Sequence, residues 1–231
     1  MNAQGKFLIV GGSQGIGLEL VNRLSQNNEV IVLSRTASDQ WKNSNIEHHF
    51  YDVLDAMTEG PEIQGLKGLV YCPGSINLKP FTSLSMEDFK NDMELNFYGF
   101  LKVLQQYVPH IQTGGSVLGF STVATKQGMP FHSSIAASKS AVNGLIKTLA
   151  SEYASKIRFN AIAPTLTETG LAQKLLRNER MVEKMQERHP LKRICHPDEI
   201  AALAEFLLSE NAAGISGQII DVDNGILHMK L

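Results

Sequence analysis

Three glycines near the N-terminus have the spacing of a turn that binds a phosphate. Residues 7–10 form a continuous apolar run, which is typical of a strand buried on both faces. Gly11, Gly15 and Gly17 follow this run, and the apolar residues after them recur at the spacing of one helix face. Glycine permits a tight turn and a close approach of the backbone to a pyrophosphate, and a helix N-terminus offers free N–H groups to an anion. The segment therefore predicts a dinucleotide-binding turn; the alternative is a tight structural turn without a ligand.

The rest of the chain alternates between strand and helix patterns that would hold such a turn in place. We expect long helices at residues 86–110, 134–154 and 197–209, and strands at residues 7–10, 29–33, 46–51, 66–71, 116–120, 157–162 and 218–222. This order predicts the α/β class, as a Rossmann-type three-layer sandwich with a parallel sheet of about seven strands and helices on both faces. Residues 1–231 are expected to form one dinucleotide-binding domain. The charged segment 166–189 breaks the rhythm and is interpreted as an insertion that acts as a lid.

Several side chains follow directly after the predicted strands. Ligands of open α/β sheets bind beyond the carboxyl ends of the strands. Besides the glycine turn, the residues expected at these ends are Arg35, Asp52, Gly74, Thr122 and Pro164. We therefore expect them to share one cleft.

The composition is that of an ordinary globular protein. Of the 231 residues 43% are apolar and 19% charged, and the net charge of −2 gives no indication of nucleic acid or an anionic membrane as a partner. The two cysteines, Cys72 and Cys195, are not spaced as metal ligands, so no metal is expected. No apolar run reaches the length of about 18 residues that a membrane span needs. Residues 1–5 are too short and too polar for a signal peptide, so we expect a cytoplasmic protein.

Taken together, these motifs resemble the short-chain dehydrogenase/reductase family, and most of all its ketoacyl-(acyl carrier protein) reductase branch. The similarity extends over nearly the whole chain. Residues 11–17 match the glycine motif, Asp52 and Val53 match the pair that contacts adenine, and Pro164 and Thr169 match the segment that holds the nicotinamide amide. The resemblance implies a cofactor site made of Gly11, Ser13, Gln14, Gly15, Ile16, Gly17, Arg35, Asp52, Val53, Gly74, Lys139, Pro164, Thr167 and Thr169.

The active-site helix departs from the family pattern at one position. The family carries Tyr-x-x-x-Lys, whereas here Ile135 stands one helical turn before Lys139. Counting back from Ile135 at the family's spacing leads to Thr122, whose hydroxyl can donate a hydrogen bond as the family's serine does. The resemblance implies catalytic roles for Asn96, Thr122 and Lys139. Isoleucine has no proton to give, and general acid catalysis is worth about 10²–10⁴-fold, so ordinary carbonyl reduction is expected to be slow.

Three hypotheses follow from this departure. In the first, the protein is an oxidoreductase that interconverts a carbonyl and an alcohol, and the proton comes from Thr122, a water held by Asn96 and Lys139, Ser133, Ser134 or His132. In the second, it binds the cofactor without turnover, as a sensor or as the partner of an active homologous subunit. In the third, it is a structural domain that has lost the cofactor, although the retained glycines, Asp52 and Lys139 argue against this. The resemblance favours an enzyme.

The end of the second predicted strand favours NADP over NAD. An acid there would bind the adenine ribose hydroxyls of NAD, but Ser34 and Arg35 occupy this position. Arginine can pair with the 2′-phosphate of NADP; the alternative is a solvated surface charge. NADP-binding family members often carry a basic residue where this chain has Gln14. The resemblance further implies a small-molecule carbonyl or alcohol substrate and a homodimer or homotetramer.

Overall fold

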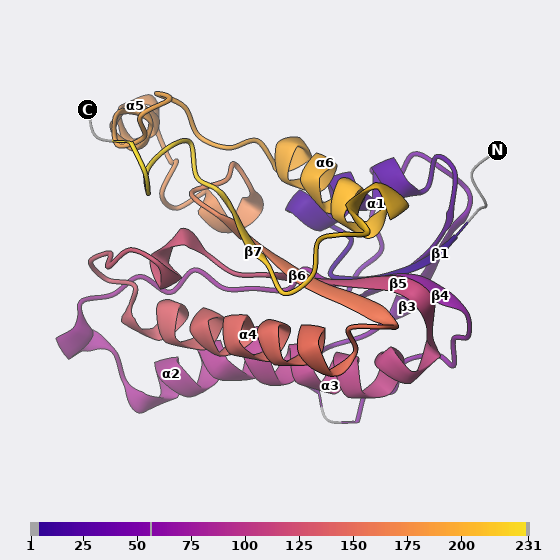
Figure 1. Ribbon diagram of the computed structural model, residues 1–231. Helices are drawn as coiled ribbons and strands as arrows, with labels where there is room; N and C mark the ends of the chain where they lie inside the picture. The colour runs from indigo at the N-terminus through magenta and orange to yellow at the C-terminus, as the bar shows by residue number, and fades with distance from the viewer. Residues whose placement is uncertain (1–4, 56, 230–231) are drawn as a thin grey trace.

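A parallel sheet of seven strands runs through the centre of the molecule (Figure 1). The computed structural model describes residues 5–55 and 57–229. In chain order the strands are β1 (Lys6–Val10), β2 (Glu29–Ser34), β3 (Ile46–Phe50), β4 (Leu66–Tyr71), β5 (Ile111–Phe120), β6 (Ile157–Pro164) and β7 (Ile219–Val222). They are arranged in the order β3-β2-β1-β4-β5-β6-β7, and all seven predicted strands are confirmed. β5 begins five residues earlier than the apolar run indicates, where its register with β4 shifts.

The centre of the sheet is buried on both faces, because successive apolar side chains of its strands point to opposite sides. Along β1, Leu8 and Val10 join one core cluster, whereas Phe7 and Ile9 join the other. The first cluster is covered by α3 (Gly99–Tyr107) and α4 (Ser133–Glu152), with α2 (Met86–Met93) packed against α4, and the second by α1 (Gly15–Leu24) and α6 (Pro197–Leu208). Figure 1 shows these two helical layers on opposite sides of the sheet, which confirms the Rossmann-type three-layer architecture.

The stretch predicted as one long helix, residues 86–110, is a chain of shorter pieces. It begins at a capping box, in which the Ser85 hydroxyl accepts from the backbone N–H of Asp88 and the Asp88 carboxylate accepts from that of Ser85. Between α2 and α3 lies a π-helical turn, Glu94–Tyr98, and a 3₁₀ turn follows α3. Asn96 lies within the π-helical turn, a feature that is frequent at functional sites.

The segment predicted as a lid is only partly helical. It contains a 3₁₀ turn, Gly170–Ala172, and α5, Glu179–Glu187, which begins where the Asn178 side chain accepts from the backbone of Met181. An isolated β-bridge joins Thr167 to Cys195 and ties the start of the segment to the chain before α6. α5 stands apart from the sheet, near the end of the chain (Figure 1). Movement of this segment as a lid stays a prediction.

The remaining general features concern membranes, thiols and metals. Within the described ranges, no helix is both long and apolar enough to cross a bilayer. Cys72 and Cys195 are free thiols. The described residues include no cluster of three or more His, Cys, Asp or Glu side chains arranged to hold a metal ion.

Replacing Phe100 tests the packing beneath α3. Its side chain is 1% exposed, and its ring centroid lies 5.1 Å from that of Tyr71 on β4. Phe100→Ala should lower the free energy of unfolding by about 3–5 kcal/mol, because it removes buried apolar surface and leaves a cavity. Chemical denaturation measures the change. Met86→Ala, at a side chain that is 74% exposed, should change it by less than about 0.5 kcal/mol, and equal losses in the two variants would contradict this packing.

Candidate functional site

The glycine turn adopts a conformation that side chains would obstruct. Gly11 and Gly15 have positive φ angles of 79° and 55°. A Cβ atom on Gly17 would lie 2.2 Å from the carbonyl oxygen of Gly11, so α1 packs directly against the turn. The Gln14 side chain at the N-cap makes no capping hydrogen bond, which leaves the first-turn N–H groups to a ligand or solvent. The turn therefore fits a pyrophosphate.

This turn lines a cavity of about 280 Å³, here called the turn cavity, together with residues that follow β2, β3 and β4. The predicted cofactor residues on its wall are Gly11, Ser13, Gln14, Gly15, Ile16, Gly17, Arg35, Asp52, Val53, Gly74 and Thr169. Asp52 accepts a hydrogen bond from the backbone of Leu54 at 3.0 Å, which orients its carboxylate. At the end of β2, Ser34 is buried and donates to the Thr36 carbonyl, and Arg35 is exposed. Arg35, Asp52 and Gly74, which were predicted to share one cleft with the glycine turn, all line this cavity.

A second cavity of about 260 Å³, here called the lysine cavity, adjoins the first. The two share the wall residues Ile16, Cys72, Gly74, Thr169 and Leu171. The other predicted site residues on the wall of the lysine cavity are Thr122, Ile135, Lys139, Pro164 and Thr167. Apart from Asn96, the predicted site residues thus line two connected cavities at one edge of the sheet.

Asn96 lies behind this wall and not on it. A Cβ atom built on Gly74 would be 3.4 Å from Asn96 Oδ1 and 3.5 Å from Lys139 Nζ. Asn96 Oδ1 is buried and has no hydrogen-bond partner among the described residues. The amide oxygen and the ammonium group therefore approach the same small space beside Gly74, which a side chain at that position would fill.

The predicted proton donors differ in where they lie. Thr122 and His132 line the lysine cavity, and the Thr122 hydroxyl oxygen accepts from the backbone of Ala124 at 3.3 Å, so its proton is free to point into the cavity. Ser133 is exposed, and the buried Ser134 hydroxyl donates to the Asp88 carbonyl on α2 at 3.3 Å. The last two are not on the cavity wall, because the N-terminal turn of α4 directs them towards solvent and α2.

Lys139 is the buried cation of the site. Its side chain and that of Ile135 lie one turn apart on α4, and each residue is 6% exposed. Burial lowers the pKa of the Lys139 ammonium group to about 8, against the opposing effects of Cys72 and of the negative charge of Asp92. An amine with a pKa this close to neutrality is able to exchange protons under physiological conditions.

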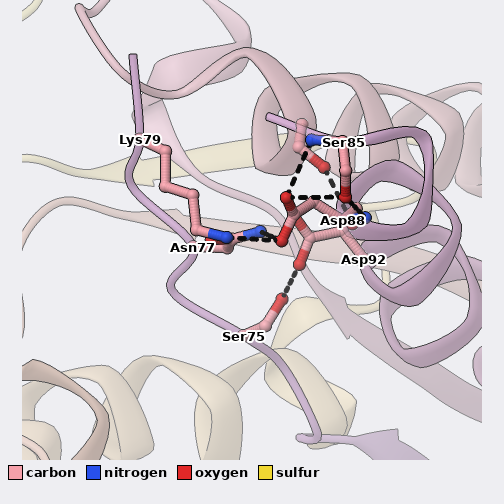
Figure 2. A network of polar contacts seen from close by, with 7 residues as sticks. Ser75, Asn77, Lys79, Ser85, Asp88 and Asp92 are labelled. Atoms are coloured by element: carbon pink, nitrogen blue, oxygen red, sulfur yellow. Dashed lines mark hydrogen bonds and ion pairs between the residues drawn. The ribbon is translucent and has the colours of Figure 1, made fainter. Parts of the chain in front are cut away.

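Ser75 and Asp92 were not predicted from the sequence, and Ser75 connects Asn96 to the buried carboxylate of Asp92. Figure 2 shows Ser75 donating to Asp92 Oδ1, at 2.6 Å, beside the Lys79–Asp88 ion pair at the start of α2. The same Ser75 oxygen accepts from Asn96 Nδ2 at 2.9 Å. Asp92 is 2% exposed, and its Oδ2 has no partner among the described residues. The sequence feature that could have indicated this network is an acid, Asp92, one helical turn before Asn96 in a stretch with apolar spacing.

The sequence matches known protein families over most of its length. A profile of the family described as enoyl-(acyl carrier protein) reductase matches residues 47–227. A tropinone reductase homologue from Arabidopsis thaliana is 32% identical over 241 aligned residues, which cover 95% of this chain and 91% of that protein. The 3-oxoacyl-(acyl-carrier-protein) reductase FabG of Thermotoga maritima is 37% identical over 144 residues, which cover 61% of this chain but only 58% of the reductase.

Solved structures share the fold. A short-chain type dehydrogenase/reductase from Mycobacterium ulcerans superposes with a TM-score of 0.84 at 25% identity, covering 98% of this chain and 91% of that one. A short chain dehydrogenase family protein from Francisella tularensis gives a TM-score of 0.87 at 24% identity, over 98% of this chain and 100% of its own. ElxO with NADP bound gives a TM-score of 0.84 at 23% identity, with coverage of 98% and 100%.

The charge of Asp92 is expected to sustain the ionisation of Lys139. Replacing it in Asp92→Asn removes a negative charge from the neighbourhood of the ammonium group, so the pKa of Lys139 should fall below about 8. Titration of isotope-labelled lysine side chains by NMR measures this value. Asp88→Asn, one turn earlier on α2, should leave it unchanged, since Asp88 pairs with Lys79. A wild-type pKa near the ordinary value of 10.5 would contradict the burial of this amine.

Proposed function

Because the chain belongs to the short-chain dehydrogenase/reductase family, we propose that it binds NADP(H) and interconverts a carbonyl compound and an alcohol. The observation that carries the proposal is the buried Lys139 on the wall where the lysine cavity adjoins the glycine turn. Burying an ammonium group costs free energy, which a purely structural domain would avoid by placing the lysine at the surface. A cofactor that spans both cavities gives this cation a partner.

The proposed cofactor would be held along the two cavities. The glycine turn takes the pyrophosphate, and Asp52 and Val53 take the adenine. Pro164, Thr167 and Thr169 take the nicotinamide amide at the entrance of the lysine cavity. When bound, the nicotinamide supplies or accepts the hydride.

Three side chains of this protein act on the substrate oxygen and in proton transfer. The Thr122 hydroxyl orients the carbonyl oxygen, for which its free proton is suited. Lys139 holds the nicotinamide ribose and places a positive charge near the oxygen where negative charge develops. Asn96 Oδ1 and Lys139 Nζ hold a water between them, in the space beside Gly74.

The wall of the lysine cavity favours a substrate with an apolar body. Its apolar side chains include Ile76, Leu78, Met129, Leu175, Met185 and Ile226. Among the described lining residues the only full charges are those of Lys139 and Arg188, both positive. We therefore propose a small apolar ketone or alcohol, or an acyl group, as the substrate class.

An oligomer is part of the proposal. All four residues of the edge strand β7 are only partly buried in the single chain, and Phe206 on α6 is 41% exposed. Sheet edges and apolar side chains of this kind are usually covered in folded proteins. This supports a homodimer or homotetramer.

The second candidate function is cofactor binding without turnover. Ile135 favours it, because this side chain faces the lysine cavity and has no proton to transfer. Such a protein would act as a sensor or as the partner of an active homologous subunit. The two candidates differ in whether NADPH is consumed when a ketone is present.

Arg35 should set the preference between the two dinucleotides. Arg35→Ala should weaken NADPH binding by about ten-fold, since it removes a charge-assisted contact with the 2′-phosphate at an exposed position. Titration by cofactor fluorescence measures both dissociation constants, and that of NADH should stay within about two-fold. Wild-type protein that binds neither dinucleotide would overturn the proposed function.

Restoring a hydroxyl at position 135 should raise the rate. Ile135→Tyr places an acid one turn from Lys139, where the ammonium charge lowers the pKa of the phenol, so it should reduce an acetoacetyl thioester with NADPH faster than the wild type, by adding a second route for the proton. Ile135→Phe has the same ring without the hydroxyl and is the matched control. Equal rates in the two variants, with NADPH bound in both, would count against a proton-donor position at residue 135.

A further inference from the structure

The lysine cavity contains a hydroxyl–imidazole pair that the family resemblance does not account for. Thr165, directly after β6, has its Oγ1 2.8 Å from His189 Nε2. On the other side of the ring, His189 Nδ1 lies 2.8 Å from the carbonyl oxygen of Met185. Both Thr165 and His189 line the lysine cavity, and His189 is 3% exposed.

These contacts determine which ring nitrogen carries the proton. A carbonyl oxygen only accepts, so Nδ1 of the neutral imidazole must be the donor to Met185. Nε2 then has a free lone pair, and the Thr165 hydroxyl donates to it. A hydroxyl that donates to an unprotonated imidazole nitrogen is arranged to pass its proton to that base.

We propose that Thr165 and His189 are the proton-transfer pair of this site, with Thr165 contacting the substrate oxygen and His189 exchanging the proton with Thr165. The proposal rests on the proposed function, since it assigns the proton that must accompany the hydride. The pair supplies the transferable proton that the isoleucine side chain at position 135 lacks.

The other hydroxyl–base pair on this wall is less suited to the task. Ser75 also donates to a titratable side chain, Asp92, but its oxygen already accepts from Asn96. No described residue donates to Thr165 Oγ1, so that oxygen is free to accept from a substrate hydroxyl. Thr122 offers a proton to the cavity without a titratable group behind it.

The step balances in both directions. In alcohol oxidation the substrate C–H bond breaks and its hydride goes to the oxidised nicotinamide dinucleotide named above. The substrate O–H proton moves to Thr165 Oγ1 while the Thr165 proton moves to His189 Nε2, so the C=O double bond forms and an imidazolium remains. In reduction the imidazolium returns its proton through Thr165 to the oxygen of the new alcohol. Nδ1 keeps its hydrogen bond to Met185 throughout.

Other titratable groups face the same cavity, and a pH test must separate them. They are Cys72, His132, Lys139 and, next to His189 in the chain, Arg188. None of the described lining residues is an acid. Lys139, with a pKa of about 8, is the main competitor as a proton donor.

The first test needs no substrate. NMR of isotope-labelled histidine in the full-length protein should show His189 with its proton on Nδ1, and the Nε2 resonance should shift in Thr165→Val but not in Thr165→Ser. His110→Asn, on the 3₁₀ turn after α3, assigns a histidine resonance outside the cavity. A His189 ring protonated on Nε2 in the neutral form would overturn the proposal, because it leaves no base for the threonine.

The second test follows the proton during turnover. For reduction of an acetoacetyl thioester by NADPH, Thr165→Val and His189→Gln should each lower the rate by about 10²-fold, whereas Thr165→Ser retains most of it. The wild-type rate of reduction should fall as pH rises, because only the imidazolium can give a proton, and His189→Gln should lose this fall. His110→Asn should keep the wild-type profile.

Cofactor affinity distinguishes a failure of the proton-transfer pair from a failure of the proposed function. All variants should bind NADPH within about two-fold of the wild type. Wild-type rates and pH profiles in Thr165→Val and His189→Gln, with NADPH bound, would overturn the proton-transfer pair while leaving the proposed function standing. Absence of NADPH binding by the wild type would instead defeat the proposed function.

Discussion

The site is organised around a cation that the fold keeps away from water. Lys139 is 6% exposed, and its charge is opposed by desolvation before any ligand arrives. The surrounding polar groups are arranged accordingly: Asp92 supplies a buried negative charge, and Ser75 and Asn96 connect that carboxylate to the space beside Gly74. The glycine turn, the ends of the strands and the start of α4 position the walls around this charge.

Features fixed by neighbouring residues could be predicted from the sequence. The seven strands, the glycine turn and the cap at Ser85 each follow from local apolar patterns, backbone freedom or short-range hydrogen bonds. Parallel pairing then brings the carboxyl ends of the strands to one edge, so the residues of the turn cavity could be named in advance. The break between α2 and α3 could not, because apolar spacing continues through the π-helical turn without a signal.

Contacts between segments that are distant in the chain could not be predicted from the sequence. Thr165 and His189 are 24 residues apart and meet because the chain leaves β6, passes through α5 and returns to the cavity wall. Ser133 and Ser134 were candidate proton donors close to Ile135 in sequence, yet helical geometry turns them away from the cavity. Ile135 on α4 and Thr165 after β6 lie far apart in the sequence, and only the folded chain shows that both face the lysine cavity.

The π-helical turn at Glu94–Tyr98 also restricts how this protein can change over evolution. One residue corresponds to about 100° of rotation along a helix, so losing a residue here would restore regular winding and turn α3 relative to α2 by that angle. Asp92 lies on one side of the turn and Phe100 on the other, one directed to the polar network and one to the core. A deletion could satisfy either side chain but not both. This stretch should therefore tolerate substitution far better than any change in length.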